Sequence, residues 1–379
     1  MMIFLMKIKT SFQVLLVIAI WICTFAGCKK VQTENELVRE TENEYLNSLL
    51  GGAPVQLIDL DKSNADSLHI DEQNILGMES IEDFPFPLDL YGVNGMIAIG
   101  DKVYVAAQRH NNIWVMNKSG VWIRKVGREG RGPGEFRNLR SLNKNNHSIY
   151  SMDVGNQRVF VYDYNLNFKN SLDAQFTWPE NNMAVDDVYL YLPSDLSSEY
   201  LIEIRDANAP FNQKGTFVPR LIPNGMQPFA YNLYKITANH NELIAFGYTG
   251  LPYVFIFDKT LKHILTLVLK SETFNEFENP PVRPVRGSEN DIYRVNLFFE
   301  GLFLMENGSL YIAQQPFLHR LNWNGEQFDV MQSWRFTYSE PDENEDSVRT
   351  IYVHDVIAET NVMYLSSRLS PYVFRIYLN

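Results

Sequence analysis

A glycine-rich stretch is the first place where residue types and spacing could support chemistry. Gly127, Gly130, Gly132 and Gly134 recur within the run Gly127–Phe136. Successive backbone N–H groups in such a loop can cradle a phosphate, but a phosphate loop opens a helix, and here strand-like segments lie on both sides. The structural alternative is a tight left-handed turn between two strands. The sequence alone leaves both interpretations open.

Arginines in this stretch and in later linkers form a second candidate group. They stand out because the protein is acidic, with a formal net charge of −12. Guanidinium groups bind carboxylates in a bidentate manner, so we expect these residues to bind a ligand at one rim of the fold. The alternative is that they only keep long loops solvated. The expected ligand-binding residues are Arg128, Arg131, Glu135, Arg220, Arg283 and Arg286.

Catalytic and metal-binding patterns are absent from the sequence. The seven histidines show no close metal-type spacing, and neither a His-Glu-x-x-His nor a Gly-x-Ser-x-Gly motif occurs. We therefore predict no catalytic residue, no metal and no cofactor. Segments that are distant in sequence can still assemble a site, so an enzyme is less favoured but not excluded.

The N-terminus carries a cysteine with its own chemistry. Lys7 and Lys9 precede the apolar run Phe12–Ile22, which is too short to span a bilayer, and Ala26-Gly27-Cys28 follows. This arrangement resembles a bacterial lipobox, in which the cysteine thiol takes a lipid; the alternative is a signal anchor with an incidental cysteine. The expected parts are a lipoprotein signal peptide at 1–27, a lipidated cysteine and polar tether at 28–53, and one domain at 54–379.

Charge and cysteine content limit the partners. An acidic protein repels phosphate backbones and anionic headgroups, so we expect no nucleic acid and contact with a membrane through the lipid on Cys28 only. The other cysteine, Cys23, lies inside the predicted signal, which leaves no disulfide. The expected location is the cell envelope, where the lipid anchors the protein in the outer membrane on either the periplasmic or the exposed side. The expected partner is an unknown envelope protein or a glycan.

Repeated apolar segments define the elements that must position these residues. Each is preceded by one shorter strand-like segment, and most are followed by two more. Four-stranded units repeated six times describe an all-β, six-bladed β-propeller; a pair of irregular β-sandwiches is the alternative. The repeated segments are Val103–Ala106, Ile149–Met152, Val188–Tyr191, Leu243–Phe246, Leu310–Ala313 and Val362–Leu365.

The two ends of the chain predict how the ring closes. The last unit ends at Asn379 just after its third strand, and the alternating segment Val55–Leu60 belongs to no unit. We therefore expect Val55–Leu60 to complete the final blade, which would remove an exposed sheet edge.

One stretch of the sequence carries a family resemblance. Gly127–Phe136, followed by Ile149–Asp163, resembles an NHL-type propeller blade with its glycine-rich entry loop. Together with the lipobox, the chain is similar to the TolB-like six-bladed propeller lipoproteins of Bacteroidetes. The resemblance implies the fold and the envelope location, and it implies no catalytic residue.

Two functional hypotheses remain. The first is an envelope-anchored binding or scaffold module for a protein, peptide or glycan. The second is a hydrolase or lyase that acts on a polymer at the mouth of the propeller channel. An enzyme predicts acids or histidines from different blades that converge in a pocket, whereas a scaffold predicts a broad exposed rim.

Overall fold

The computed structural model describes most of the chain beyond residue 43. The described residues are 44–62, 65–76, 93–176, 182–221, 232–239, 243–271, 282–284, 293–295, 297–339, 348–359, 361–367, 370 and 372–378. The chain divides into the units 1–40 and 41–379. The predicted signal peptide and Cys28 lie outside the described residues.

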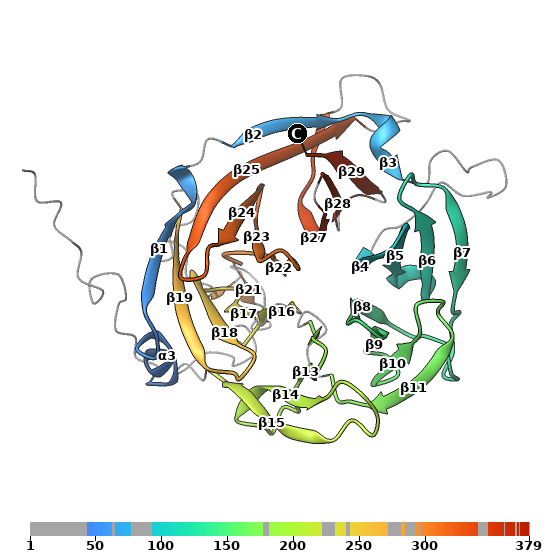
Figure 1. Ribbon diagram of the computed structural model, residues 1–379, viewed down its shortest axis with the longest axis horizontal. Coiled ribbons are helices and arrows are strands. Elements are labelled where there is room, and N and C mark those ends of the chain that lie inside the picture. The colour runs from blue at the N-terminus through green and yellow to red at the C-terminus, as the bar shows by residue number, and fades with distance from the viewer. Residues whose placement is uncertain are drawn as a thin grey trace, which may run out of the picture. The chain divides into compact units, whose positions relative to one another are not determined.

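Six sheets, each with four blade strands that pair antiparallel, form a ring of blades (Figure 1). The six-bladed propeller predicted from the repeats is confirmed, and each repeated segment is the second strand of its blade. Blades 1 to 3 contain β4 (Val93–Ile99), β5 (Lys102–Ala107), β6 (Asn112–Asn117) and β7 (Trp122–Val126), then β8 (Leu139–Lys144), β9 (Ile149–Asp153), β10 (Arg158–Tyr162) and β11 (Phe168–Asp173), then β12 (Ala184–Val185), β13 (Tyr189–Pro193), β14 (Tyr200–Asp206) and β15 (Gln213–Pro219).

The remaining blades continue the ring with the same strand order, from the channel outward. They contain β16 (Tyr234–Ala238), β17 (Leu243–Tyr248), β18 (Tyr253–Asp258) and β19 (His263–Lys270), then β22 (Gly301–Leu304), β23 (Ser309–Gln314), β24 (Phe317–Trp323) and β25 (Phe328–Ser339), then β27 (Val353–Ala358), β28 (Val362–Ser367) and β29 (Val373–Tyr377). Smaller elements are α3 (Glu44–Leu50), η1 (Leu60–Lys62), η2 (Glu72–Asn74), η4 (Gln108–His110), the β20–β21 hairpin (Val282–Pro284 with Tyr293–Val295) and β26 (Val348–Thr350), which pairs with β25.

The hydrophobic core lies between neighbouring blades. Tyr104 and Ala106 of β5 pack in the cluster shared with blade 2, whereas Val103 and Val105 pack in the cluster shared with blade 6. Because successive side chains of a strand point to opposite faces, both faces of a middle strand are buried. This is why the second strands are continuous apolar runs in the sequence.

The N-terminal segment runs along the outside of three blades. β1 (Val55–Asp59) pairs in parallel with β19 of blade 4, and β2 (Asp66–Ile70) pairs in parallel with β25 of blade 5. β3 (Ile75–Leu76) then pairs antiparallel with β29 and supplies the outer strand of blade 6. A segment from the N-terminus thus closes the last blade.

The prediction that Val55–Leu60 is the closing strand was wrong. Ile75 and Leu76, which do close the ring, are 5% and 1% exposed, whereas Leu57 of β1 is 37% exposed. Alternating residues predict a strand but not the sheet edge that it joins. Two earlier strands, β1 and β2, pair with blades 4 and 5, so the chain reaches blade 6 only at β3.

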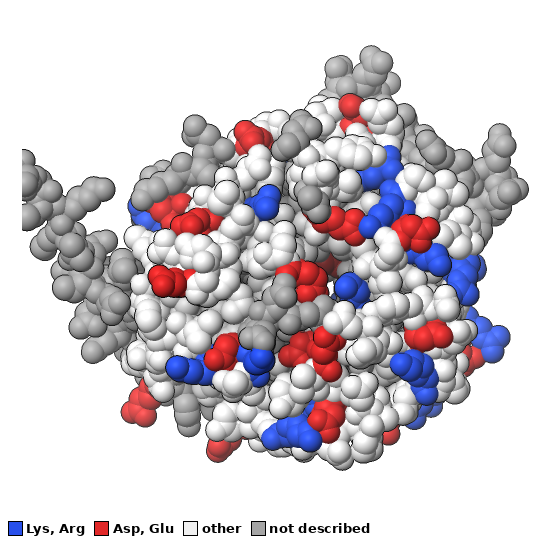
Figure 2. Space-filling model, viewed as in Figure 1, with Lys and Arg blue, Asp and Glu red and all other residues white. Residues whose placement is uncertain are grey.

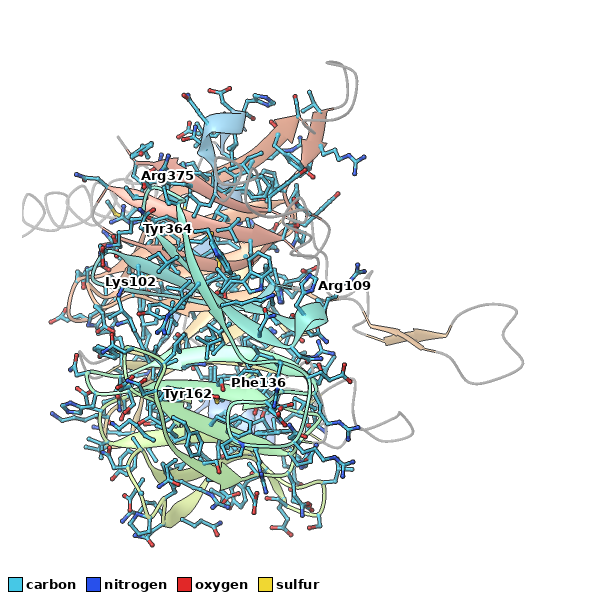
Figure 3. All side chains as sticks on the ribbon, turned by 90° about the vertical axis from the view of Figure 1, so that its right-hand side faces the viewer. Lys102, Arg109, Phe136, Tyr162, Tyr364 and Arg375 are labelled. Atoms are coloured by element: carbon cyan, nitrogen blue, oxygen red, sulfur yellow. The ribbon has the colours of Figure 1, made fainter. Side chains whose placement is uncertain are left out.

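The loops of the propeller lie on two opposite faces. We call the face with the connections between blades the linker face; it also holds the hairpins between second and third strands. The hairpin face holds the hairpins between first and second strands and between third and fourth strands. Arg109 of η4 and Lys102 at the start of β5 mark these two faces on blade 1 (Figure 3).

The described part of the chain has no helix that is long and apolar enough to cross a membrane. Its one α-helix, α3, spans seven residues at the end of the predicted tether, and Leu46 and Leu50 of this helix are buried.

Candidate binding site in the central channel

A cavity of about 440 Å³ occupies the centre of the propeller and is lined by the innermost strands of all six blades. Small-molecule sites usually have volumes of roughly 300–1,000 Å³. The cavity is therefore large enough for a compound of monosaccharide size or for the end of a longer chain.

Polar side chains from every blade line the end of the cavity at the linker face. Each inner strand begins at this face, because it follows the connection from the preceding blade. Five of these residues directly follow a buried apolar residue, as Arg140 follows Leu139 and Lys235 follows Tyr234. The six residues, one from each of blades 1 to 6, are Asn94, Arg140, Asn182, Lys235, Glu300 and His354.

A chain of hydrogen bonds holds Arg140 in place. Nε of Arg140 donates to Oδ1 of Asn138 over 3.1 Å, and Nε2 of Gln108 donates to the same oxygen over 2.8 Å. The backbone N–H of Asn138 donates to the buried carboxylate of Asp153 over 2.9 Å. Because its anchor is itself fixed, Arg140 has a defined position at the channel mouth.

The same chain of hydrogen bonds continues to blade 6. Nδ2 of Asn94 donates to Oε1 of Gln108, and Oδ1 of Asn94 lies 3.3 Å from Nε2 of His354. An amide oxygen can only accept a hydrogen bond, so the Asn94 oxygen accepts from Nε2 of His354. The network therefore connects blades 2, 1 and 6 along the linker end of the cavity.

Asp355 adds a carboxyl group beside this network. Its Oδ2 accepts the backbone N–H of Met96 in blade 1 over 2.6 Å, and its Oδ1 accepts that of Val356 over 2.9 Å. Burial raises the pKa of Asp355 to about 7, and the two backbone N–H groups and the positive charge of Lys235 partly offset this rise. Lys235 of blade 4 thus acts electrostatically on a carboxyl group of blade 6.

Other polar residues of the inner strands connect adjacent blades. Asn182 of blade 3 exchanges two hydrogen bonds with the backbone of Ile236 in blade 4, at 2.8 and 2.9 Å. Thr237 of blade 4 accepts the backbone N–H of Leu304 in blade 5 over 3.1 Å. These contacts connect blade 4 to both of its neighbours along the channel.

Beyond the polar end, the wall of the cavity is partly apolar. Phe303, Met305 and Ile357 line it and are partly exposed. The ring of Phe303 packs so closely over Gly301 that a Cβ atom there would lie 2.4 Å from the ring. Phe303 therefore adds an aromatic side chain to the cavity lining, while it also packs against the core cluster of blades 5 and 6.

The end of the cavity at the hairpin face carries a different set of charges. Lys144, Glu306 and Glu359 line it, and Glu359 also forms an ion pair with Lys118 at 2.5 Å. Acidic and basic side chains surround the small opening at the centre of this face (Figure 2).

The glycine-rich loop forms the linker from β7 to β8, and Glu135 occupies its backbone donors. The Glu135 carboxylate accepts the N–H groups of Gly132 over 2.8 Å and Arg131 over 3.0 Å. It also pairs with the Arg128 guanidinium at 2.7 Å. The bond from Gly132 and the bond from Arg128 lower the pKa of Glu135. The loop holds its own carboxylate where the phosphate hypothesis requires a ligand, which supports the turn interpretation.

Glycine is required where this loop leaves β7. Gly127 has a φ of +98°, and a Cβ atom there would lie 2.5 Å from the ring of Phe136. Phe136 is fully buried between blades 1 and 2, edge-on to Phe160 with ring centroids 5.6 Å apart. The loop therefore covers the buried ring of Phe136.

The other predicted ligand-binding residues are distributed as follows. Arg220 is 8% exposed and donates to the carbonyls of Ser198 over 2.7 Å and Asp195 over 2.8 Å, so it holds the β13–β14 hairpin. Arg283 lies in β20, and its side chain is outside the described residues, as is all of Arg286. A rim built from these arginines stays a prediction.

Within the ranges that the structure describes, no group of three or more His, Cys, Asp or Glu side chains is arranged to hold a metal ion. His319 is 3% exposed, lies 2.7 Å from the Ser333 hydroxyl through Nδ1, and has a pKa lowered to about 4 by burial. It is a core residue of blade 5.

Comparison with protein families supports the fold. A model of the DUF5128 family, described as a 6-bladed beta-propeller, matches residues 89–239, which is less than half of the chain. A search of functionally curated proteins finds no significant match. The NHL-type and TolB-like resemblance stays a prediction beyond its propeller part.

Solved structures of similar fold include proteins from several bacteria. A member of the duf4221 family from Bacteroides vulgatus has 10% identity, a TM-score of 0.49, and 81% of this chain and 94% of that chain covered. A putative exported protein from Bacteroides fragilis has 13% identity, a TM-score of 0.44, and coverages of 70% and 80%. Virginiamycin B lyase from Staphylococcus aureus has 8% identity, a TM-score of 0.43, and coverages of 76% and 96%. Such low identities concern the fold alone.

The channel residues were not predicted from the sequence, although a signal for them exists. An apolar residue that becomes buried is followed by a polar one at Val93-Asn94, Leu139-Arg140, Tyr234-Lys235, Phe299-Glu300 and Val353-His354. These pairs begin the inner strands, which are the least regular strands of the repeat.

Proposed function

We propose that this protein is an envelope-anchored binding module that takes a small ligand, or the end of a protein, peptide or glycan chain, into its central channel. The single observation that carries the proposal is the cavity, into which all six blades contribute side chains. An apolar wall with a few fixed polar groups is typical of ligand sites. In this proposal the ligand binds in the channel pocket, whereas a scaffold would bind its partner on a broad exposed rim.

Blocking the channel tests this proposal. Ala238 lines the cavity and is partly exposed, so Ala238→Trp should fill it. We expect at least one class of sugar, sugar acid, amino acid or dipeptide to raise the melting temperature of the wild-type protein by a few degrees, roughly what saturation well above Kd produces. The blocked variant should show no such rise. Equal shifts in both proteins, with circular dichroism unchanged, would contradict the proposal.

The envelope anchor rests on the sequence around Cys28. Metabolic labelling with a fatty-acid analogue should modify the wild-type protein and leave Cys28→Ala unlabelled. The variant should then fractionate with soluble proteins. Membrane association of an unlabelled wild-type protein would show that the anchor has been assigned wrongly.

A second candidate function is a polymer-acting hydrolase or lyase, and one observation favours it. Glu300 of blade 5 and His354 and Asp355 of blade 6 line the same cavity, and a buried carboxyl group with a raised pKa is a common catalytic acid. Asp355 is the carboxyl group with the raised pKa, so new chain ends released from a polysaccharide by the wild-type protein, but not by Asp355→Asn or His354→Asn, would support this candidate over simple binding.

A further inference from the structure

We infer that the channel ligand carries a carboxylate, which Arg140 and Lys235 bind at the linker end while a ring-sized body of the ligand rests against Phe303. This inference rests on the proposed function and specifies its ligand. It covers a free sugar acid and the C-terminus of a peptide, which present the same anionic group.

Charge distribution along the cavity is the first support. At the linker end, Arg140 and Lys235 contribute two positive charges, against Glu300 and the partly protonated Asp355. At the opposite end, Lys144 stands against Glu306, and Glu359 is already paired with Lys118. In a protein with a net charge of −12, the linker end is therefore the favourable end for an anion.

Positioning of the cations is the second support. Arg140 and Lys235 belong to blades 2 and 4, which are separated by blade 3, so they approach the channel from different directions. The bond from Nε of Arg140 to Asn138 fixes the side chain along one edge of the guanidinium. A fixed guanidinium binds a carboxylate with little loss of conformational entropy.

The body of the ligand must fit below this polar end. The cavity of about 440 Å³ includes Phe303, Met305 and Ile357. An aromatic face and two aliphatic side chains suit the apolar face of a sugar ring or a side chain of a terminal amino acid. A compact inorganic anion would leave this wall unused.

Calorimetry with matched probe pairs tests the inference. The pairs are glucuronate with glucose, and a hydrophobic dipeptide with its C-terminal amide, titrated at low salt and slightly acidic pH. We expect the carboxylate member of at least one pair to bind at least tenfold more tightly than its neutral counterpart. The pair that responds distinguishes a sugar acid from a peptide end.

Variants locate the binding. Arg140→Gln and Lys235→Gln should each lower the affinity for the carboxylate probe about tenfold or more. Arg140→Lys should retain part of the affinity. Arg109→Gln and Lys102→Gln are matched controls because neither residue lines the cavity, and they should bind as the wild type does. Because Arg140 supports a hydrogen-bond network, Lys235→Gln provides the test if Arg140→Gln fails to fold.

The outcomes separate this inference from the proposed function. Equal affinity for the neutral probes, lost on Ala238→Trp, would overturn the carboxylate inference and leave channel binding intact. Carboxylate binding that persists in both Arg140→Gln and Lys235→Gln would also overturn it. If neither carboxylate probe binds, the inference is overturned as well. The thermal-shift screen with Ala238→Trp decides the proposed function independently.

Discussion

Arg128 and Arg140 belong to the same basic stretch of sequence, yet the structure gives them different surroundings. The Arg128 side chain is 81% exposed and pairs with Glu135 of its own loop. Arg140 is partly buried, held by Asn138, and lines the central cavity. The comparison shows that local charge density does not identify the cation that lines the central cavity. Position on an inner strand does.

The two regions are also connected, because the loop ends at the residue that holds Arg140. Asp153 accepts the backbone N–H groups of Asn138 over 2.9 Å and Arg137 over 3.0 Å, and Asn156 Nδ2 donates both to Asp153 and to the carbonyl of Gly130. The glycine-rich linker and the β9–β10 hairpin thus form one unit. This unit holds Asn138 in place, and Asn138 in turn holds Arg140 at the channel.

Removing the link between the two regions should have the largest effect. Asp153 is fully buried and accepts several backbone N–H groups, so Asp153→Ala leaves them unpaired. We expect the free energy of unfolding to fall by about 4 kcal/mol in urea titrations. Asp163→Ala removes a similar set of bonds in an exposed turn and should cost about 1 kcal/mol. Equal losses would mean that the hydrogen bonds to the buried Asp153 stabilise the fold no more than those of an exposed turn.

Adding a methyl group to the loop should cost less. Gly127→Ala combines a positive φ with overlap of the Phe136 ring, whereas Gly134→Ala has a φ of +75° and nothing within 4 Å. We expect losses of about 3 and about 1 kcal/mol respectively, since a positive φ alone costs roughly 1–2 kcal/mol. A difference near zero between the variants would show that Phe136 moves aside freely.

Titration of Asp355 should have a moderate effect that depends on pH. Its pKa is raised to about 7, so the folded protein holds this proton more tightly than the unfolded chain. This residue therefore makes the free energy of unfolding fall as pH rises from about 4 to about 7, with no further change from it above that range. Lys235, His354, Glu300 and Arg140 also face the channel and contribute their own charges.

Urea titrations at several pH values check this expectation. Asp355→Asn should lose the part of the slope that belongs to Asp355, whatever its absolute stability. An unchanged slope would assign the pH dependence to other groups. Carboxylate affinity should weaken as pH rises through about 7, because Asp355 ionises there in the folded protein and then repels the ligand.

Removing the exposed loop cations should have the smallest effect. Arg128→Ser with Arg131→Ser leaves the Gly132 N–H bond to Glu135 in place, so stability should change by no more than about 0.5 kcal/mol. Affinity for the channel ligand should not change either. A loss of channel binding in this variant would remove the distinction between the two regions.

The prediction of a binding rim is tested separately. Replacement of Arg128, Arg131, Arg283 and Arg286 together by Ser should keep the fold and, if these residues grip an envelope partner, abolish its capture. Unchanged capture would leave the inner strands as the remaining candidate surface.

The sequence by itself determined the repeating part of this protein. The recurrence of short, largely apolar segments such as Ile149–Met152 and Leu310–Ala313 was enough to predict six blades, because burial between two neighbouring sheets leaves a local pattern of residue types. For the glycine-rich stretch, the sequence offered a turn as one of two interpretations, since positive φ angles favour glycine, and the contacts of Glu135 then favoured the turn. The envelope anchor at Cys28 is a sequence prediction of the same local kind.

Only the tertiary structure decided which distant segments meet. Val55–Leu60 has the alternation of a strand, but its partner is β19 rather than β29. Glu135 fills its own loop, and Arg140 and Lys235 line the same cavity from blades 2 and 4. Strand pairing and channel lining depend on contacts between residues far apart in the chain, so a local apolar-polar pair can mark an inner strand but does not show which side chains share one cavity.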